Sequence, residues 1–303
     1  MDKILTIGIP TYNRPEYIQK TVRSILPQLN DKVLLVVRDN CSQIPVESLF
    51  TNNELKLFKI VRTKVNIGGN ANIAGVIYNC DTPWCWTLGD DDDVAPNAVN
   101  TILNYIERYP STSFIKFNSP LEKEVNGFDD LVQLIKHKYV YSRLLFMSTS
   151  IYNVEKVKNY LYYYYESLST QSGQVVFFLK YMEYNNGNAI FTKTSIIPHS
   201  NPPEWNFENY IRPCPVYFNM FKEQRKKLNN NLFVGLTFGY FYNILFGKMK
   251  PKLKWDLFWY VAWNYGYYNT FRYHGKLIIQ FLVYVLLPNR IYLYLKDKLK
   301  THE

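Results

Sequence analysis

The chain has 303 residues, is 47% hydrophobic and carries a formal net charge of +10. By length and composition it can bury a sizeable core, as one large domain or as one domain with an appendage. The four cysteines form no CxxC pair, which indicates reduced thiols in the cytosol. Neither GxGxxG nor GxxxxGK[ST] occurs, which argues against a nicotinamide-dependent enzyme and against a P-loop ATPase.

The excess positive charge lies in the last third of the chain. Residues 1–211 hold 20 Lys and Arg against 21 Asp and Glu, whereas residues 212–303 hold 15 against 4. The same segment is rich in aromatic residues and leucine. A basic, aromatic segment can bind anionic lipid headgroups or nucleic acid, although lysines on ordinary packed helices give the same composition.

Strands and helices are predicted to alternate over the first 120 residues. Continuous apolar runs predict buried strands over 4–9, 33–37, 57–61, 84–88 and 113–117. Apolar residues at helical spacing predict helices over 15–29, 73–80 and 98–106. This alternation predicts a doubly wound, mostly parallel α/β sheet that binds its ligands at the carboxyl ends of the strands.

The pattern weakens after residue 120. We expect helix over 128–145, a tyrosine-rich helix over 154–168, and either strand or helix over 174–184. Five prolines within 198–215 predict an extended connection. The remaining residues predict helices over 217–230, 231–247, 253–271 and 275–299. The chain is therefore expected to form two parts, residues 1–215 and a basic, aromatic, helical region over 216–303.

A run of four aspartates, Asp90 to Asp93, follows the strand predicted over 84–88 and Gly89. Carboxylates this close repel one another unless they are well solvated or a cation neutralises them. Mg²⁺ or Mn²⁺ typically takes one or two protein carboxylates together with substrate phosphates. The alternative is an acidic loop that caps the helix beginning near Pro96.

Polar residues also follow the first two predicted strands, over 10–14 and 38–42. A nucleotide-sugar site needs a carboxylate or amide that contacts the base, and carboxylates that hold a metal ion against the diphosphate. Asp39 fits the first requirement, and the run from Asp90 to Asp92 fits the second. A single Asp after a strand is also a common turn former, so the position of Asp39 alone decides nothing.

Four segments resemble the N-terminal half of family 2 glycosyltransferases in sequence, order and spacing. They are TIGIPTYNR (6–14), VVRDNCS (36–42), NIGGNAN (66–72) and WTLGDDD (86–92). The resemblance is strong over roughly residues 3–120 and weak beyond. It implies a GT-A fold, a nucleoside-diphosphate sugar donor, a divalent metal ion (Mn²⁺ or Mg²⁺), and transfer with inversion at the anomeric carbon.

The resemblance also implies roles for individual residues. Asp92 would bind the metal ion, with the register within the four aspartates uncertain by one, and Asp39 would contact the base. The small residues Ser148, Thr149 and Ser150 match the segment that forms the acceptor site. The nucleotide would be bound by Pro10, Thr11, Tyr12, Arg14, Asp39, Asn66, Gly69, Asn70, Asp90 and Asp91.

The chain departs from the family at the general base. Relatives carry an Asp before an apolar helix where this chain has Gln174, and glutamine cannot accept the proton of an acceptor hydroxyl. Glu166 is the nearest upstream carboxylate and our first candidate for the catalytic base, although it also suits a solvated helix end. Other candidates are Asp129, Asp130 and Glu183; His199 could reach the diphosphate or have a structural role.

The resemblance predicts a hexosyltransferase, with UDP-sugars among its candidate donors, that extends a surface polysaccharide such as an O-antigen or capsule repeat on a lipid carrier. It would work in the cytoplasm, held peripherally at the anionic inner face of the cell membrane by residues 216–303. Two alternatives stay open: a catalytically inactive scaffold at the membrane, and a nucleic-acid-binding α/β protein. We expect no nucleic-acid partner, because no such binding motif is present.

Overall fold

The computed structural model describes residues 3–200, apart from 136, 138 and 139, together with residues 259, 263, 275, 278 and 279. The described fold belongs to a compact unit that spans Met1–Asn206. The predicted boundary at residue 215, residues 201–215 of the predicted extended connection and most residues of the helices predicted after it lie outside the described residues. The division of the chain at that boundary therefore stays a prediction.

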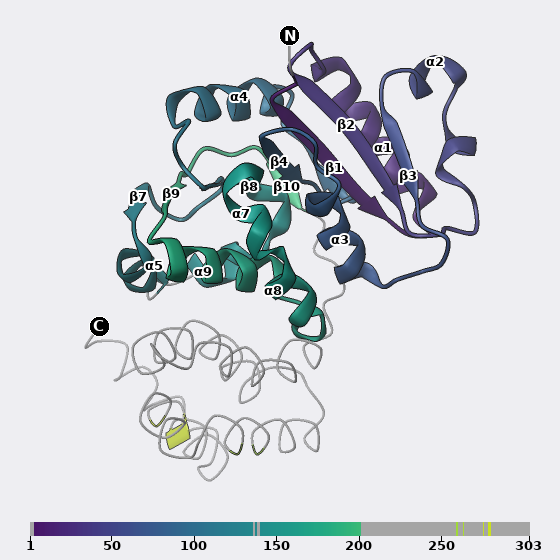
Figure 1. Cartoon of the computed structure of the whole chain (residues 1–303). Coiled ribbons are helices and arrows are strands. Elements are labelled where there is room, and N and C mark those ends of the chain that lie inside the picture. The colour runs from purple at the N-terminus through teal and green to yellow at the C-terminus, as the bar shows by residue number, and fades with distance from the viewer. Residues whose placement is uncertain are drawn as a thin grey trace, which may run out of the picture. The chain divides into compact units, whose positions relative to one another are not determined.

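A mixed, mostly parallel sheet of eight strands runs through this unit, with helices on both of its faces (Figure 1). The strands lie in the order β3-β2-β1-β4-β8-β6-β9-β7. The first four are parallel: β3 (Lys59–Arg62), β2 (Val33–Asp39), β1 (Leu5–Thr11) and β4 (Trp84–Thr87). This arrangement confirms the predicted α/β class and places the ends of three motif-bearing strands side by side.

The other four strands mix directions. β8 (Ser150–Asn153) is antiparallel to both β4 and β6 (Phe114–Lys116). Next to β6 lies the parallel strand β9 (Asn188–Phe191), and β7 (Lys123–Asn126) is antiparallel to β9 at the edge of the sheet. The sequence did not predict β7 or β9. β7 has only one buried residue, Val125, and so lacks an apolar pattern, whereas β9 has three buried residues in a strand of only four.

The alternating residues of β1 explain how helices cover both faces. Leu5, Ile7 and Ile9 belong to one buried core cluster with apolar residues of α1 (Pro15–Ile25) and α4 (Ala98–Arg108). On the opposite face, a Cβ on Gly8 would lie 2.1 Å from Cγ1 of Val76. Only glycine allows α3 (Gly69–Tyr78) to approach β1 this closely, which fixes the loop before α3 beside the strand ends.

The helices after β6 form the second part of this unit. They are α5 (Phe128–Ile135), α6 (Val140–Leu145), α7 (Val154–Val157), α8 (Leu161–Glu166) and α9 (Gly173–Asn185). Aromatic rings hold them to the sheet: Phe114 packs on Phe178 with ring centroids 4.1 Å apart. The segment 174–184, left open as strand or helix, lies in α9, which ends at Asn186 in the left-handed region (φ 47°).

Two predicted helices are broken into shorter ones. The segment 128–145 contains α5 and α6 as separate helices. The tyrosine-rich segment 154–168 contains α7, the 3₁₀ turn η4 (Lys158–Tyr160), α8 and the start of η5 (Leu168–Thr170). The hydroxyl of Ser167 contacts the carbonyl oxygens of Tyr163 (2.7 Å) and Tyr164 (3.0 Å), a local contact that accompanies the end of α8.

Short elements complete the described fold. They are η1 (Leu26–Gln28), η2 (Val46–Leu49), α2 (Asn52–Leu55), η3 (Met147–Thr149), and the two-residue strands β5 (Asp92–Asp93) and β10 (His199–Ser200). β5 and β10 pair antiparallel, with His199 opposite Asp93. Among the described residues, no helix is both long enough and apolar enough to cross a bilayer.

Candidate active site

The first acidic side chain after β4 is held by residues at the end of β1. Asp90 is 6% exposed and accepts hydrogen bonds from Oγ1 of Thr11 (2.6 Å) and Nη1 of Arg14 (3.0 Å). The same Nη1 donates to Asp91 at 2.9 Å. Burial raises the pKa of Asp90, while the Thr11 hydrogen bond and the Arg14 charge oppose that rise. Four predicted nucleotide-binding residues from two distant motifs therefore form one connected cluster.

The side chain of Asp92 lies in a second environment beside this cluster. Asp92 is 5% exposed, and its Oδ2 accepts a hydrogen bond from the hydroxyl of Ser148. The hydroxyl of Ser148 also accepts a hydrogen bond of 2.8 Å from the backbone N–H of Gly89. Burial raises the pKa of Asp92 to about 6, the Ser148 hydrogen bond opposes that rise, and the neighbouring aspartates add to it. Nearby positive charge would thus favour the ionised carboxylate.

The oxygens of this acidic run fit part of a divalent-cation site. Within the described part of the chain, no three His, Cys, Asp or Glu side chains converge as a complete set of metal ligands. Mg²⁺ and Mn²⁺ need no such set, since substrate phosphates and water fill most positions around the ion. A Cβ on Gly89 would lie 2.6 Å from an oxygen of Asp92 and 3.2 Å from one of Asp91, so glycine leaves room for two grouped oxygen donors.

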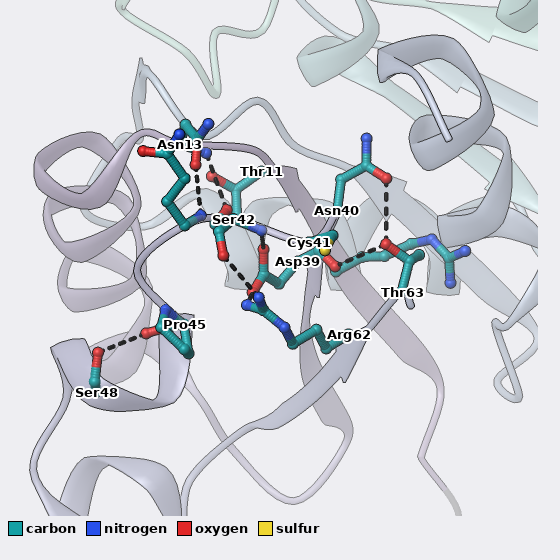
Figure 2. A network of polar contacts seen from close by, with 12 residues as sticks. Thr11, Asn13, Asp39, Asn40, Cys41, Ser42, Pro45, Ser48, Arg62 and Thr63 are labelled. Atoms are coloured by element: carbon teal, nitrogen blue, oxygen red, sulfur yellow. Dashed lines mark hydrogen bonds and ion pairs between the residues drawn. The ribbon is translucent and has the colours of Figure 1, made fainter. Parts of the chain in front are cut away.

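Asp39, at the end of β2, is fully buried and its carboxylate is engaged on both oxygens (Figure 2). Oδ1 accepts a hydrogen bond of 2.9 Å from the N–H of Ser42, and Oδ2 is paired with Arg62. Nη2 of Arg62 also donates to the carbonyl oxygen of Ser42 at 2.7 Å. The sequence analysis missed Arg62, although a basic residue at the end of a predicted third strand was a visible signal.

The loops after β1 and β2 are joined to each other. The N–H of Asn13 donates to the hydroxyl of Ser42 (2.9 Å), and Oδ1 of Asn13 accepts from the N–H of Gln43 (2.7 Å). Asn13 has a φ of 53°, a left-handed conformation that Asn tolerates well. A pocket of about 90 Å³ opens at this junction, lined by Thr11, Asn13, Arg14, Ser42, Gln43 and apolar residues of α1 and η2.

The loop before α3 and the first turn of α3 carry three further predicted nucleotide-binding residues. Asn66 accepts a hydrogen bond of 2.8 Å from Nδ2 of Asn40, which follows Asp39 in the chain. Gly69 begins α3 and has open space at its Cβ position. Nδ2 of Asn70 donates to the carbonyl oxygen of Leu168 at 2.8 Å. The structure therefore places this loop between the end of β2 and the turn that follows α8.

The predicted acceptor residues lie in η3 and at the start of β8. Ser148, Thr149 and Ser150 are all fully or almost fully buried. Oγ1 of Thr149 donates to the carbonyl oxygen of Phe146 (3.1 Å), and Oγ of Ser150 accepts from Nζ of Lys116 (2.8 Å). Of the remaining predicted nucleotide-binding residues, Pro10 lies within β1, and Tyr12 follows that strand with 41% of its surface exposed.

Residues 6–166, more than half of the chain, match the family model described as glycosyl transferase family 2. The chain belongs to glycosyltransferase family 2. It is 28% identical to the abequosyltransferase RfbV of Salmonella typhimurium over an alignment of 109 residues. This alignment covers 34% of this chain and 33% of RfbV. It is also 24% identical over 152 residues to an uncharacterized glycosyltransferase of Haemophilus influenzae. This alignment covers 49% of this chain and 50% of that relative. These alignments span half or less of the curated relatives.

Solved structures of glycosyltransferases share the fold. The S. aureus TarS 1–349 structure superposes with a TM-score of 0.58 at 12% identity, covering 99% of this chain and 92% of that one. The mannosyltransferase PcManGT from Pyrobaculum calidifontis, in complex with GDP-Man and Mn²⁺, gives a TM-score of 0.51 at 11% identity, covering 99% and 81%. At these identities the likeness concerns the fold alone, and it agrees with the predicted GT-A architecture.

The candidates for the catalytic base of this family 2 chain differ in their surroundings. Glu166 ends α8 and is exposed, two residues before Leu168, whose carbonyl oxygen contacts Asn70 in the first turn of α3. Asp130 pairs with Lys123 (3.2 Å) near the edge of the sheet, and Glu183 pairs with Lys180 (2.8 Å). Asp129 lies beside Asp130 in the first turn of α5. Glu166 is thus the candidate whose chain neighbour Leu168 contacts a predicted nucleotide-binding residue, Asn70.

Gln174 stands where relatives carry a carboxylate, and its side chain has a structural contact. It is 9% exposed, and its Nε2 donates a hydrogen bond of 3.0 Å to the carbonyl oxygen of Leu145, just before η3. The backbone of His199 pairs with Asp93 in the two-stranded ladder.

Proposed function

We propose that this chain is an inverting glycosyltransferase that moves a sugar from a nucleoside-diphosphate sugar to an acceptor hydroxyl with the help of Mn²⁺ or Mg²⁺. The observation that carries the proposal is the connected cluster of Thr11, Arg14, Asp90 and Asp91, with Asp92 beside it, at the carboxyl ends of β1 and β4. Family membership supports it. So do relatives solved with donors: TarS 1–349 with UDP-GlcNAc, and PcManGT with GDP-Man and Mn²⁺.

In this proposal Asp39 accepts a hydrogen bond from an N–H of the nucleotide base. A carboxylate oxygen has two lone pairs, so the contacts with Ser42 and Arg62 leave further acceptor capacity. Arg62 compensates the charge of the buried carboxylate before the base arrives. The remaining predicted nucleotide-binding residues, Pro10, Tyr12, Asn66, Gly69 and Asn70, are proposed to contact other parts of the nucleotide.

Asp92 is the proposed ligand of the divalent ion. Arg14 is paired with Asp90 and Asp91, whereas Asp92 contacts the neutral hydroxyl of Ser148, so its carboxylate suits a cation. When bound, the ion acts as a Lewis acid that stabilises the charge of the departing nucleoside diphosphate. Arg14 holds Asp90 and Asp91 in place and limits the repulsion between the three carboxylates.

Glu166 is the proposed catalytic base, which takes the proton from the acceptor hydroxyl. Its exposure fits a group that meets an acceptor arriving from solution. The segment from Ser148 to Ser150 is proposed to border the acceptor site.

The proposed acceptor is a growing, lipid-linked surface polysaccharide such as an O-antigen or capsule repeat, and the activity is that of a hexosyltransferase. The name of the relative RfbV, an abequosyltransferase, supports a sugar-transferring role. The proposed location is the cytoplasm, at the inner face of the membrane, supported by the 15 Lys and Arg against 4 Asp and Glu of residues 212–303. Sedimentation with anionic vesicles tests this: salt-sensitive binding is expected, and protein left in the supernatant at low salt contradicts it.

Donor recognition is tested by a thermal-shift screen of nucleoside diphosphates and their sugars with Mn²⁺, followed by donor hydrolysis with and without chelator. We expect one nucleotide to raise the melting temperature and hydrolysis to require the ion. Gln174 favours a second candidate, a catalytically inactive scaffold, because the usual carboxylate is missing. Nucleotide binding without hydrolysis or transfer would support the scaffold, and an absence of nucleotide binding would contradict both.

A further inference from the structure

The hydroxyl of Ser148 both donates and accepts a hydrogen bond, and both partners lie in the segment from Gly89 to Asp92. It donates its single proton to Oδ2 of Asp92 and accepts the N–H of Gly89 at 2.8 Å. Ser148 and Asp92 are 1% and 5% exposed, so water does not compete for these contacts. A serine hydroxyl has one proton to donate, and here it is given to Asp92. Ser148 is therefore better placed to orient Asp92 than to donate to an acceptor sugar.

The backbone around Ser148 is fixed from the neighbouring strand. Nε1 of Trp86 donates to the carbonyl oxygen of Ser148 at 2.7 Å, and Oγ1 of Thr87 donates to the carbonyl oxygen of Met147 at 3.2 Å. Trp86 and Thr87 belong to β4, the strand that leads into the acidic run. The strand that delivers Asp92 thus also holds the turn that delivers Ser148.

A buried lysine holds the same segment from the other side. Lys116 of β6 is 0% exposed, and its Nζ donates to the carbonyl oxygen of Phe146 (2.6 Å) and to Oγ of Ser150 (2.8 Å). These two partners flank Ser148 in the chain. Burying the polar end of a lysine is costly unless it is hydrogen-bonded, and these two contacts supply its hydrogen bonds. Fixing the segment from Phe146 to Ser150 is the role that its contacts indicate.

We propose that Ser148 is a positioning residue that holds the Asp92 carboxylate in its metal-binding orientation, and that Lys116 fixes the segment that carries Ser148. The inference rests on the proposed function, since it takes Asp92 as the ligand of Mn²⁺ or Mg²⁺. Groups that hydrogen-bond a metal ligand orient it, and their loss typically weakens metal binding without removing any ligand.

The affinity for Mn²⁺ tests the role of Ser148 directly. Free Mn²⁺ is measured by electron paramagnetic resonance while the full chain is titrated with Mn²⁺, in the presence of the nucleoside diphosphate that stabilises it most. For Ser148→Ala we expect Kd for Mn²⁺ to rise about 10-fold. Ser113→Ala is the matched control, because Ser113 is equally buried but its hydroxyl contacts the carbonyl oxygen of Asn188. An unchanged Kd in Ser148→Ala would overturn the proposal.

A double-mutant cycle tests the link between Lys116 and Ser148. Lys116→Met should raise Kd for Mn²⁺, and adding Ser148→Ala should raise it little further, because both changes release the same carboxylate. Fully additive effects would contradict the link. If Lys116→Met does not fold, Ser150→Ala removes one of the two Lys116 contacts, and it should also raise Kd; an unchanged Kd in that variant would contradict the role of Lys116.

The same titration separates this inference from the proposed function. If the unmodified chain binds no Mn²⁺ with any nucleoside diphosphate, the proposed function fails and the inference fails with it. If the unmodified chain binds Mn²⁺ and Ser148→Ala binds it equally well, the inference alone fails. A rise in KM for the acceptor with no change in Kd for Mn²⁺ would assign Ser148 to the acceptor site instead.

Discussion

Two regions of the described unit use their polar side chains differently. At the ends of β1 to β4, which we call the donor region after its proposed role, charged side chains pair with one another, as Arg14 does with Asp90 and Arg62 with Asp39. In the region formed by β6 to β9 and α5 to α9, the acceptor region, buried polar side chains mostly hold backbone carbonyl oxygens. Lys116 contacts Phe146 in this way, and Gln174 contacts Leu145.

This difference suggests that the polar side chains of the two regions serve different purposes, ligand binding in one and stabilisation of the backbone in the other. Ion pairs at strand ends can exchange partners when a charged ligand arrives, which is consistent with the phosphate and metal ion proposed to bind in the donor region. Side-chain contacts to backbone carbonyl oxygens hold the backbone in place, and a charged ligand does not replace either partner. We therefore expect substitutions in the donor region to change ligand binding and turnover. In the acceptor region we expect substitutions to change stability first, except at Glu166 and at Lys116, for which the roles proposed above predict effects on rate and on metal binding.

The largest effect is expected at Asp92. Asp92→Ala should abolish metal-dependent transfer, because a metal ion supplies several kcal/mol of transition-state stabilisation. The fold should remain, since the replaced side chain lies outside the apolar core, and circular dichroism checks this. Asp93→Ala is the control, because the Asp93 carboxylate is 38% exposed and paired with Lys20. Full turnover in Asp92→Ala, or in excess chelator, would contradict the assignment of the metal ligand.

The next largest effect is expected at Glu166, the one proposed catalytic residue outside the donor region. Glu166→Gln should keep donor binding and slow transfer by roughly 10²–10⁴-fold, the usual contribution of a general base. Single-turnover transfer measures the rate, with Glu155→Gln on α7 as an exposed control. A rate within a few-fold of the unmodified chain would move the assignment to Asp129, Asp130 or Glu183.

A smaller effect, confined to binding, is expected at Asp39. Asp39→Ala should weaken the binding of nucleoside diphosphate by roughly 1–3 kcal/mol, the cost of leaving a buried donor unpaired. Calorimetry measures the affinity, and Asp31→Ala, in the exposed turn before β2, is the control. Equal affinities for the two variants would exclude a base contact by Asp39.

The smallest effect on catalysis is expected at Gln174. Gln174→Leu should lower the free energy of unfolding by roughly 1–3 kcal/mol, because the buried carbonyl oxygen of Leu145 loses its donor. Urea unfolding measures this, with Gln133→Leu on the exposed face of α5 as the control. The transfer rate at saturating substrates should remain close to that of the unmodified chain. A large loss of rate in a stable Gln174→Leu protein would place Gln174 in the chemistry.

The donor region was largely predictable from the sequence, and the acceptor region was not. Buried parallel strands are continuous apolar runs, so Val33–Val37 marked β2 without knowledge of its neighbours. The acidic residues that follow β4 are adjacent in sequence, and their clustering was visible directly. Arg62 and Lys116 were missed because each role depends on a partner 23 or more residues away, Asp39 in one case and Phe146 in the other.

Some boundaries of the predicted elements differ from the observed ones, and the causes are local. β1 continues through Pro10, where the sequence predicted its end, because the strand pairing places Pro10 opposite Arg38 and Thr11 opposite Asp39. The segment 154–168 is not one helix, because aromatic and β-branched residues favour helices weakly and a serine hydroxyl contacts the carbonyl oxygens at the end of α8.

The pairing of β5 with β10 has a topological consequence. The chain leaves the acidic run at Asp93 and returns beside it at His199, so the elements between these two residues form an excursion whose two ends meet at the acidic run. Loop-closure entropy changes slowly with the length of such an excursion, and its ends stay joined whatever lies between them. We therefore expect changes of length between Asp93 and His199 to leave the geometry at the ends of β1 to β4 unchanged.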